Sequence, residues 1–346
     1  MSNHVIQHIE KLREQEVLSC CSVSVSRNSI KVFDYAAGYA FPGSRKEVTK
    51  KTRFNIGSIT KPITASLLIM LVEKGRIALH DSIDRYIPGF KFPNITILQM
   101  MTHISGFDGN TQFDWPKIGE RKAYYSRLYD IGELKNRPGE VNEYFSHGYS
   151  ILTDILERVT GESIESYARR NLFEPLGMLR TTFDSQMAES EDYVLPLHQE
   201  TMLPETNLSE LDITGDSGLY STAEDLLRFG NMLLQGGTWS GKRLFSIPAV
   251  RLMFQESTGN RFGRTPAFWI KTKTDMQDTT NVDVFRCFSD LASPATVGHN
   301  GFSGCMFFLD PTINLTAVIL TNSRRLHADG KNYAKWGSVI LSSLGN

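Results

Sequence analysis

The stretch Phe54-Asn55-Ile56-Gly57-Ser58-Ile59-Thr60-Lys61-Pro62 places a serine and a lysine three residues apart. Apolar residues recur at helical spacing from Ile59 onward, and Pro62 falls where a first helical turn tolerates proline. Gly75 then supplies a stop signal after Glu73 and Lys74. The pattern predicts a helix from about Ser58 to Lys74.

This spacing has a chemical meaning. Side chains three apart lie on one face of a helix, so the Lys61 ammonium can reach the Ser58 hydroxyl. The positive end of the helix dipole favours negative charge developing at Ser58. A serine hydroxyl is a weak nucleophile without such help, and a lysine serves as a base only when its surroundings lower its pKa. The pair indicates acyl-transfer chemistry, although so short a motif also arises by chance as a solvated surface pair.

The ends of the chain carry most of the strand signals. Helices are expected over about 5–15 and 332–344, and strands over about 18–26, 29–38, 304–310 and 315–321. The first two strands form a hairpin with its turn at Arg27-Asn28. The intervening chain is largely helical, with helices expected around 97–101, 150–160, 164–172 and 223–234.

Further segments follow the Ser58/Lys61 motif along the chain: Gly75-Arg76-Ile77-Ala78-Leu79-His80-Asp81, Met101-Thr102-His103-Ile104-Ser105-Gly106, Tyr144-Phe145-Ser146-His147-Gly148-Tyr149, Phe173-Glu174-Pro175-Leu176-Gly177-Met178, Gly218-Leu219-Tyr220-Ser221-Thr222 and Gly298-His299-Asn300-Gly301-Phe302-Ser303-Gly304. Together they resemble the motifs of the penicillin-recognising serine hydrolases. That family includes class C β-lactamases, serine D-alanyl-D-alanine carboxypeptidases, and related esterases and D-aminopeptidases. Several separated motifs in one order are much harder to obtain by chance than one.

The resemblance implies an α/β fold of the α+β type, similar to that of β-lactamases and transpeptidases. It implies a mostly antiparallel sheet built from both chain ends, flanked by helices, with a largely helical second lobe. We expect a single catalytic domain over 1–346, with a sheet lobe from 1–75 and 290–346 and a mainly helical and loop lobe from 76–289. The active site is expected in the cleft between them.

The resemblance also implies the roles of individual residues. Ser58 would attack an acyl carbon, while Lys61 and Tyr144 share the proton transfers. The backbone N–H groups of Ser58 and Phe302 would hold the oxyanion. His299 stands where many relatives have lysine, and is expected to act across the cleft on Tyr144 or substrate.

Substrate recognition is less clear from the sequence. Asn300 and Gly301 are expected to contact substrate, as is Ser146, which stands where the family usually has asparagine. A serine offers one donor and a shorter reach than an amide, so a purely structural Ser146 is nearly as plausible. The neighbouring His147 and His103 are interpreted as structural.

The sequence also does not decide which residues line the pocket. Aromatic residues before Tyr144 and before His299 either line an acyl pocket or pack locally; they are Phe107, Phe113, Trp115, Tyr124, Tyr125, Phe262, Phe268 and Trp269. Arg264 or Arg286 would suit a substrate carboxylate, with exposure to solvent as the default expectation for each.

Three functions compete. The leading one is a serine hydrolase that forms an acyl-enzyme on Ser58 and cleaves an ester or small amide. The second is a D-alanyl carboxypeptidase, D-aminopeptidase or β-lactamase. The third is a catalytically lapsed protein that only binds ligands in the cleft. The sequence leaves the acyl group, the leaving group, hydrolysis versus acyl transfer, the pathway and the oligomeric state undecided.

Composition sets limits that are compatible with this resemblance. The 346 residues, 40% of them hydrophobic, can bury a large core, and a net charge of −1 favours neither nucleic acid nor an anionic membrane as partner. Four cysteines, Cys20, Cys21, Cys287 and Cys305, read as apolar fillers, and no spacing fits a metal site, so neither metal nor cofactor is expected. The polar N-terminus predicts a cytoplasmic protein, unless an export signal precedes it.

Overall fold

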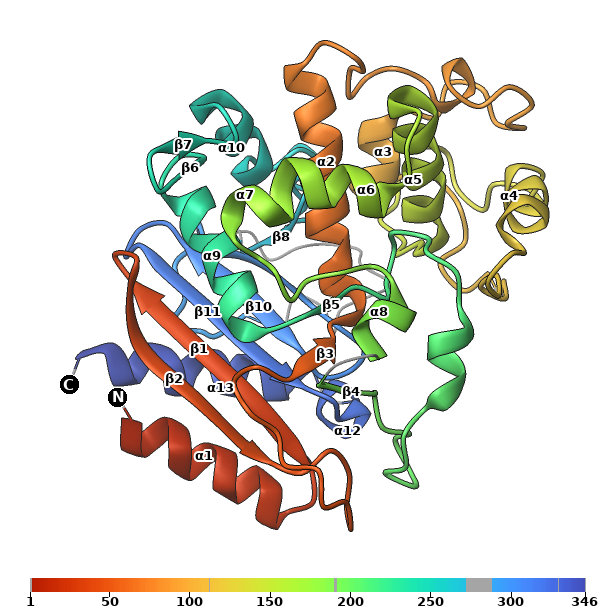
Figure 1. Cartoon of the computed structure of the whole chain (residues 1–346). Helices are drawn as coiled ribbons and strands as arrows, with labels where there is room; N and C mark the ends of the chain where they lie inside the picture. Colours follow the sequence, from red (N-terminus) through yellow and green to blue (C-terminus); the bar gives the residue numbers. More distant parts are fainter. Residues whose placement is uncertain (1, 112, 190–191, 272–287, 329, 346) are drawn as a thin grey trace.

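The computed structural model describes residues 2–111, 113–189, 192–271, 288–328 and 330–345. Its centre is a six-stranded antiparallel sheet with the order β2-β1-β11-β10-β9-β8 (Figure 1). The strands are β1 (Cys20–Arg27), β2 (Ile30–Gly38), β8 (Trp269–Ile270), β9 (Val297–Asn300), β10 (Met306–Asp310) and β11 (Leu315–Thr321). Because β1 pairs with β11, the predicted sheet built from both chain ends is confirmed.

The hairpin at the edge of this sheet differs from the prediction by one residue. Arg27 pairs with Ile30, so the turn consists of Asn28 and Ser29 rather than Arg27 and Asn28. Asn28 and Ser29 have φ angles of +52° and +61°. Two left-handed residues in succession form the turn whose twist matches that of the flanking strands.

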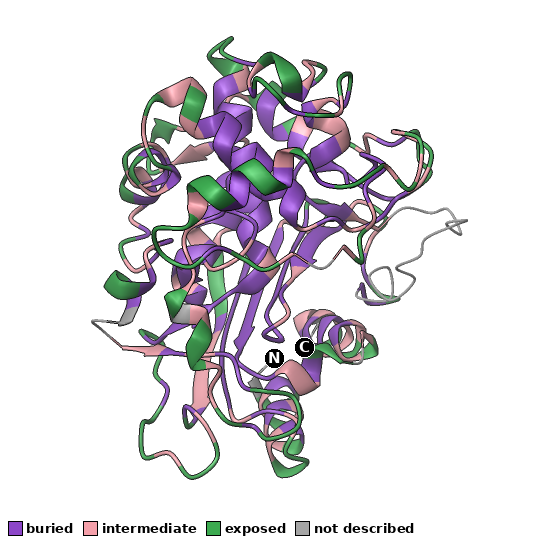
Figure 2. Cartoon of the chain, turned by 90° about the vertical axis from the view of Figure 1, so that its right-hand side faces the viewer, coloured by how far each residue is buried: buried purple, intermediate pink, exposed green. Residues whose placement is uncertain are grey.

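Both faces of the sheet are covered, as Figures 1 and 2 show. Helices α1 (Ser2–Glu14) and α13 (Lys331–Ser342) pack on one face, and α9 (Ala223–Leu234) packs on the other. Alternate strand residues point to opposite faces. Cys20 accordingly packs in the large core beneath the helical region, and Cys21 in the core beneath α1 and α13.

The three cysteines that the structure describes are buried in the core without a disulfide, as predicted. Cys20, Cys21 and Cys305 are buried free thiols. Burial raises the pKa of Cys21 to about 12 and that of Cys305 to about 11, which keeps both thiols protonated and unreactive. Cys287 lies outside the described residues.

The helical region is arranged around one central helix. A 3-10 turn, η1 (Gly57–Ile59), leads into α2 (Thr60–Glu73), whose residues are buried from Thr60 to Leu71. A helix that is apolar on all sides requires such burial, and α2 runs through the purple interior in Figure 2. The predicted helix is therefore confirmed, with Ser58 on the turn immediately before it.

Other helices surround α2, and the predicted ones are present with some shifted ends. α3 (Ile97–Met101) and α9 match the predicted ranges, α5 (His147–Thr160) starts three residues early, and α6 (Ile164–Ala168) passes into a π-helical turn, η3 (Arg169–Phe173). The remaining elements are α4 (Arg121–Tyr129), α7 (Glu174–Leu176), α8 (Ser185–Glu189), α10 (Ile247–Phe254), α12 (Arg324–His327), β3 (Arg53–Asn55), β4 (Tyr193–Val194), β5 (Tyr220–Ser221), β6 (Thr238–Trp239), β7 (Lys242–Arg243), η2 (Ile83–Arg85), η4 (Thr206–Glu210) and η5 (Ser343–Gly345).

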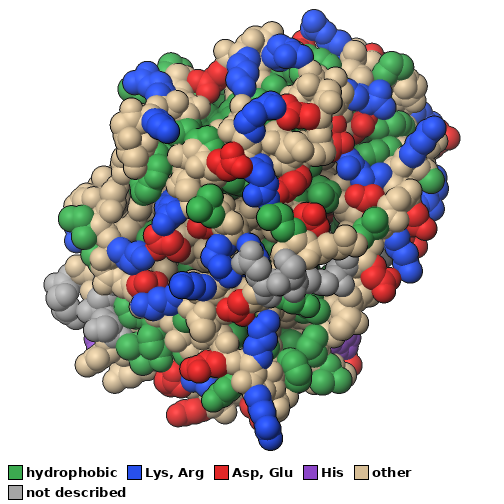
Figure 3. Space-filling view, in the orientation of Figure 1, with side chains coloured by type: hydrophobic (Ala, Val, Ile, Leu, Met, Phe, Trp, Pro, Cys, Tyr) green, Lys and Arg blue, Asp and Glu red, His purple; other side chains and the backbone are tan. Residues whose placement is uncertain are grey.

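The surface agrees with the near-neutral composition. On the face shown in Figure 3, basic and acidic side chains are interspersed rather than separated by sign. Among the helices that the structure describes, none has the length and apolar character needed to cross a membrane.

Candidate active site

The turn that carries Ser58 is held tightly against the end of β9. Gly57 has a φ of +53°, and a Cβ atom there would lie 2.8 Å from Phe302 Cδ1 and 3.1 Å from Phe302 N. At Gly301, a Cβ atom would lie 2.2 Å from the Ile56 carbonyl oxygen. Glycine at both positions lets the two backbones approach. Ser58 itself is half-buried, so its hydroxyl stands at the edge of the site.

Lys61 is fully buried one turn further along and makes three hydrogen bonds. Its Nζ donates to Ser58 Oγ at 3.2 Å, to Ser146 Oγ at 2.9 Å and to the Asp216 carbonyl oxygen at 2.7 Å. These partners match the three donors of an ammonium group. The Nζ also lies 4.9 Å from the centre of the Tyr144 ring.

Tyr144 is held by aromatic neighbours, while its hydroxyl is left without a partner. Its ring stacks on His103 at 4.3 Å and on Trp269 at 6.0 Å between ring centres. His103 Nδ1 accepts the backbone N–H of Phe145, which ties it to this segment. Tyr144 Oη is buried and makes no hydrogen bond with any described residue. A buried hydroxyl without a hydrogen-bond partner lowers the stability of the fold, and such groups are common where a protein binds substrate or transfers a proton.

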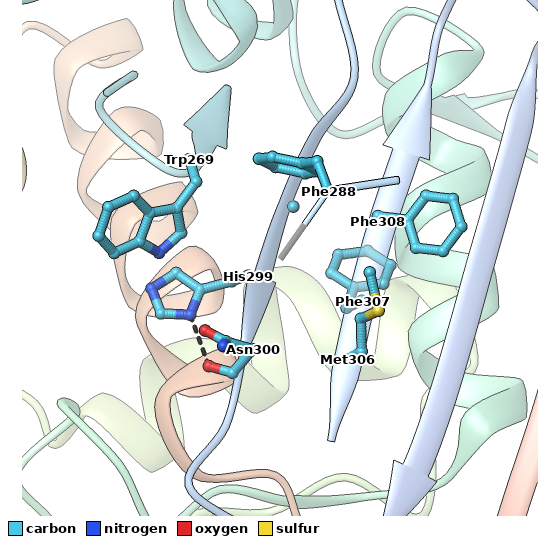
Figure 4. Close-up of a pocket in the computed structure, with 8 residues that line it drawn as sticks. Trp269, Phe288, His299, Asn300, Met306, Phe307 and Phe308 are labelled. Carbon is cyan, nitrogen blue, oxygen red and sulfur yellow. Dashed lines mark hydrogen bonds between the residues drawn. The ribbon is translucent and has the colours of Figure 1, made fainter. Parts of the chain in front are cut away.

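His299 lies on β9 at the opposite side of the site, with its ring centre 6.2 Å from that of Tyr144. Its Nδ1–H donates to the Asn300 carbonyl oxygen at 2.7 Å, as the dashed line in Figure 4 shows. Burial, assisted by the charges of Lys61 and Arg264, holds the pKa of His299 well below its ordinary value. The imidazole is therefore neutral, with Nε2 as an acceptor.

Two backbone N–H groups without hydrogen-bond partners among the described residues lie on the two segments that meet at this turn. Neither Ser58 N–H nor Phe302 N–H donates a hydrogen bond within the described part of the chain. The close contacts of Gly57 with Phe302 and of Gly301 with Ile56 bring these two segments together. Fixed donors of this kind can stabilise an oxyanion without reorganising.

Asp216 belongs to this site, although the sequence reasoning missed it. It is fully buried, and its Oδ2 accepts hydrogen bonds from Ser146 Oγ and Trp115 Nε1, each at 3.0 Å. Oδ1 accepts from Thr214 Oγ1 at 2.5 Å. Burial disfavours the carboxylate, but the charge of Lys61, the electrostatic effect of His147 and the hydrogen bonds from Thr214 and Trp115 keep the pKa of Asp216 below its ordinary value.

Arg264 differs from the expectation of an exposed arginine. It is buried, donates to Asn142 Oδ1 at 3.2 Å, and places its guanidinium over the rings of Trp269 and Tyr144. Burial lowers the pKa of Arg264 well below its ordinary value. The Arg264 guanidinium therefore lies beside the Tyr144 ring, whereas Arg286 lies outside the described residues.

Two cavities adjoin the site. One of about 40 Å³ is lined by Asn55, Trp115, Phe183, Ser185, Leu208, Leu211, Asp212, Ile213, Thr214, Ser217, Gly218, Tyr220 and Phe302. The other, of about 10 Å³, is lined by Trp269, Phe288, Gly298, His299, Asn300, Met306, Phe307 and Phe308 (Figure 4).

The aromatic residues named from the sequence therefore fall into two groups, those that line a cavity and those that pack in the core. Trp115 and Trp269 line these cavities, while Phe107, Tyr124, Tyr125, Phe262 and Phe268 are buried and Phe113 packs against the core. His147 Nδ1 meets Tyr124 Oη at 2.8 Å, as suits a structural neighbour. No group of three potential metal ligands occurs among the residues described.

Comparison with known proteins agrees with this arrangement. The sequence profile of the Beta-lactamase family matches residues 5–337, so the chain belongs to that family of serine hydrolases. A Salmonella paratyphi B protein with the provisional name D-alanyl-D-alanine carboxypeptidase is 24% identical, over 86% of this chain and 74% of its own.

Solved structures share the fold. EstCE1, described as a hydrolase with promiscuous acyltransferase activity, superposes with a TM-score of 0.80 at 18% identity, covering 98% of both chains. A penicillin-binding protein homologue from Caulobacter crescentus gives a TM-score of 0.82 at 18% identity, covering 98% of this chain and 96% of its own. The predicted mixed α/β fold with a mostly antiparallel sheet is confirmed.

The buried histidines predict how stability depends on pH. Burial lowers the pKa of His103 and of His299 well below the ordinary value, so both stay neutral when folded but gain protons when unfolded. Above about pH 6.5 neither histidine lowers the free energy of unfolding. Below that pH each lowers it by up to about 1.4 kcal/mol per pH unit, because the unfolded chain binds a proton that the folded chain does not. Urea unfolding between about pH 7.5 and 5.5 should show falling stability, with a shallower slope for His299→Gln. A flat profile would contradict the neutral imidazoles.

Proposed function

We propose that this protein is a serine hydrolase that forms an acyl-enzyme on Ser58 and cleaves an ester or a small amide. Ser58 Oγ bonds to the acyl carbon, and its proton passes through the Tyr144 and Lys61 pair to the leaving group as the acyl bond breaks. Water then attacks the acyl-enzyme, gives its proton to the same pair, and restores Ser58 as the acid departs. The N–H groups of Ser58 and Phe302 hold the oxyanion in both steps.

The observation that carries this proposal is the contact of Lys61 Nζ with Ser58 Oγ at 3.2 Å beside the Tyr144 ring. A solvated surface pair would not be buried, whereas Lys61 is fully buried. The unpartnered Tyr144 hydroxyl supplies a further proton-handling group in the same place.

A second candidate is a D-alanyl carboxypeptidase, D-aminopeptidase or β-lactamase. The provisional carboxypeptidase name of the Salmonella relative favours it, as does the histidine of His299-Asn300-Gly301. In this reading Asn300, at the end of β9, and Gly301, which follows it, would contact a peptide-like substrate. The relative rates on D-amino-acid amides, β-lactams and simple esters distinguish these candidates.

Intact-mass spectrometry tests the proposal directly. Purified protein mixed with p-nitrophenyl butyrate and quenched in acid should gain the mass of one butyryl group, and peptide mapping should place that group on Ser58. Acylation of another serine would overturn the site assignment. Labelling at Ser58 without turnover of any ester, amide or β-lactam would favour a lapsed enzyme that binds ligands.

Replacing Tyr144 by phenylalanine should slow both acylation and deacylation by about 10²- to 10⁴-fold, because the phenol carries protons in each half-reaction. Pre-steady-state release of p-nitrophenol reports acylation, and the later steady rate reports deacylation. Tyr167→Phe, which removes a hydroxyl that contacts Lys74 outside the site, serves as the matched control. An unchanged acylation rate in Tyr144→Phe would remove this role.

A further inference from the structure

The Asp216 carboxylate has no part in the reaction described above, yet it is fully buried and hydrogen-bonded to Ser146 beside Lys61. Moving a carboxylate out of water costs several kcal/mol, so a fully buried one needs partners that compensate. Ser146, Trp115 and Thr214 supply hydrogen bonds, and the charge of Lys61 stabilises the carboxylate, with a smaller contribution from His147. The main electrostatic partner of the Asp216 carboxylate is therefore the catalytic lysine.

The geometry connects the two charges through one hydroxyl. Ser146 Oγ accepts from Lys61 Nζ at 2.9 Å and donates to Asp216 Oδ2 at 3.0 Å. A hydroxyl has one hydrogen, so donation to Asp216 leaves only lone pairs directed at the ammonium. The Asp216 backbone carbonyl meets the same ammonium at 2.7 Å. One residue thus holds Lys61 by both its main chain and its side chain.

We propose that Asp216 is a positioning residue: through the Ser146 hydroxyl, its carboxylate holds the Lys61 ammonium against Ser58 and leaves Ser146 with no hydrogen to offer a substrate. The preferred substrates are then esters whose acyl group carries no amide. This inference rests on the proposed function and specifies the substrate class of that site. Family members with asparagine at the position of Ser146 have amide donors there that a single committed hydroxyl cannot replace.

A small cavity lies next to the residues that bind the Asp216 carboxylate. Trp115 and Thr214, which bind the Asp216 carboxylate, also line the cavity of about 40 Å³. The remaining lining is mixed: Phe183, Leu208, Leu211, Ile213 and Phe302 are apolar, whereas Asn55, Ser185, Asp212 and Ser217 are polar. Because their single polar hydrogens are donated to Asp216, Trp115 and Thr214 have no side-chain hydrogen left to donate to a group in that cavity.

The kinetic test compares Asp216→Asn, Ser146→Ala and the double variant. Asp216→Asn should slow the p-nitrophenol burst by about 10- to 100-fold, the usual loss when a partner of a catalytic group is removed, at unchanged KM. Because Asp216 acts through Ser146, the double variant should be no slower than the slower single variant. Asp225→Asn, a buried carboxylate bound to Thr181 away from the site, is the matched control. Additive losses, or a raised KM alone, would overturn the proposal.

A readout that needs no turnover separates this proposal from the proposed function. With ¹⁵N-labelled lysine, the ammonium resonance missing from Lys61→Arg identifies Lys61. That signal should be visible through slow hydrogen exchange in the wild-type protein and broadened in Asp216→Asn. If it depends on Asp216 but Ser58 is never acylated, the hydrolase proposal fails and positioning stands. If Ser58 is acylated and neither the ammonium signal nor the burst depends on Asp216, the positioning proposal fails while the hydrolase proposal stands.

Matched esters test the substrate class. p-Nitrophenyl butyrate and the p-nitrophenyl ester of N-acetylglycine have acyl chains of similar length, but only the second carries an amide. We expect kcat/KM to be at least as high for butyrate. A tenfold or greater preference for the amide-bearing ester that disappears in Ser146→Ala would show that Ser146 donates to substrate, and would overturn this part of the proposal.

Discussion

Alanine in place of Ser58 is expected to lower p-nitrophenyl butyrate hydrolysis at least about 10³-fold, because a nucleophile and its base act as a unit in such sites. The oxyanion donors are backbone groups and would remain, so a small residual rate is compatible with the mechanism. The substitution removes one half-buried hydroxyl whose bond to Lys61 is 3.2 Å long, so circular dichroism and thermal unfolding should change little.

Ser66 provides the matched control for this experiment. It lies further along the same helix, is buried, and donates to the Pro62 carbonyl oxygen at 2.7 Å. Ser66→Ala should keep the wild-type rate, which separates loss of the nucleophile from a general effect of removing a buried hydroxyl. Equal rates for Ser58→Ala and the wild-type protein would place the chemistry elsewhere.

Replacing Lys61 by methionine should abolish hydrolysis and lower the free energy of unfolding. Methionine retains much of the apolar stem but leaves the buried Asp216 carboxylate without its compensating charge. Breaking a buried charge pair typically costs 3–5 kcal/mol, and with the Ser146 hydroxyl between the charges we expect about 3 kcal/mol. Urea unfolding at pH 7 measures this loss, and Lys74→Met, at the exposed C-cap of the same helix, should stay within about 0.5 kcal/mol of wild type.

The double variant Lys61→Met/Asp216→Asn reveals the cause of that loss. If uncompensated charge destabilises the single variant, removing the carboxylate should recover part of the lost stability while hydrolysis stays abolished. A double variant less stable than Lys61→Met alone would instead assign the loss to packing or to the hydrogen bonds of the Asp216 carboxylate.

The parts of the fold that sequence reasoning predicted well depend on local signals. Helix α2 has a run of apolar residues with proline near its start and glycine after its end, and its predicted range was accurate. The turn of the β1–β2 hairpin was misplaced by one residue, because neither Asn28-Ser29 nor Arg27-Asn28 contains the glycine that usually marks such a turn. Helix α5 starts at His147, where no capping side chain signals its beginning.

The site shows the same division between local and distant information. Ser58 and Lys61 are neighbours on one turn and could be paired from spacing, and their contact in the structure agrees. Asp216 lies 155 residues beyond Lys61, so no periodicity connects them. The burial of Arg264 likewise depends on Asn142, 122 residues away. Contacts of this kind are set by how loops pack, which composition and spacing do not encode.

The pairing of β1 with β11 also has a consequence for how the protein is made. During synthesis, the β1–β2 hairpin is complete at Gly38, 277 residues before Leu315 begins the strand that covers the edge of β1. At about 5–20 residues per second, that edge stays exposed for roughly 15–60 s. Nascent chains on neighbouring ribosomes offer the same unpaired edge, so intermolecular pairing competes with completion of the sheet. Slower growth of the culture at low temperature, or more chaperone, should therefore raise the soluble yield.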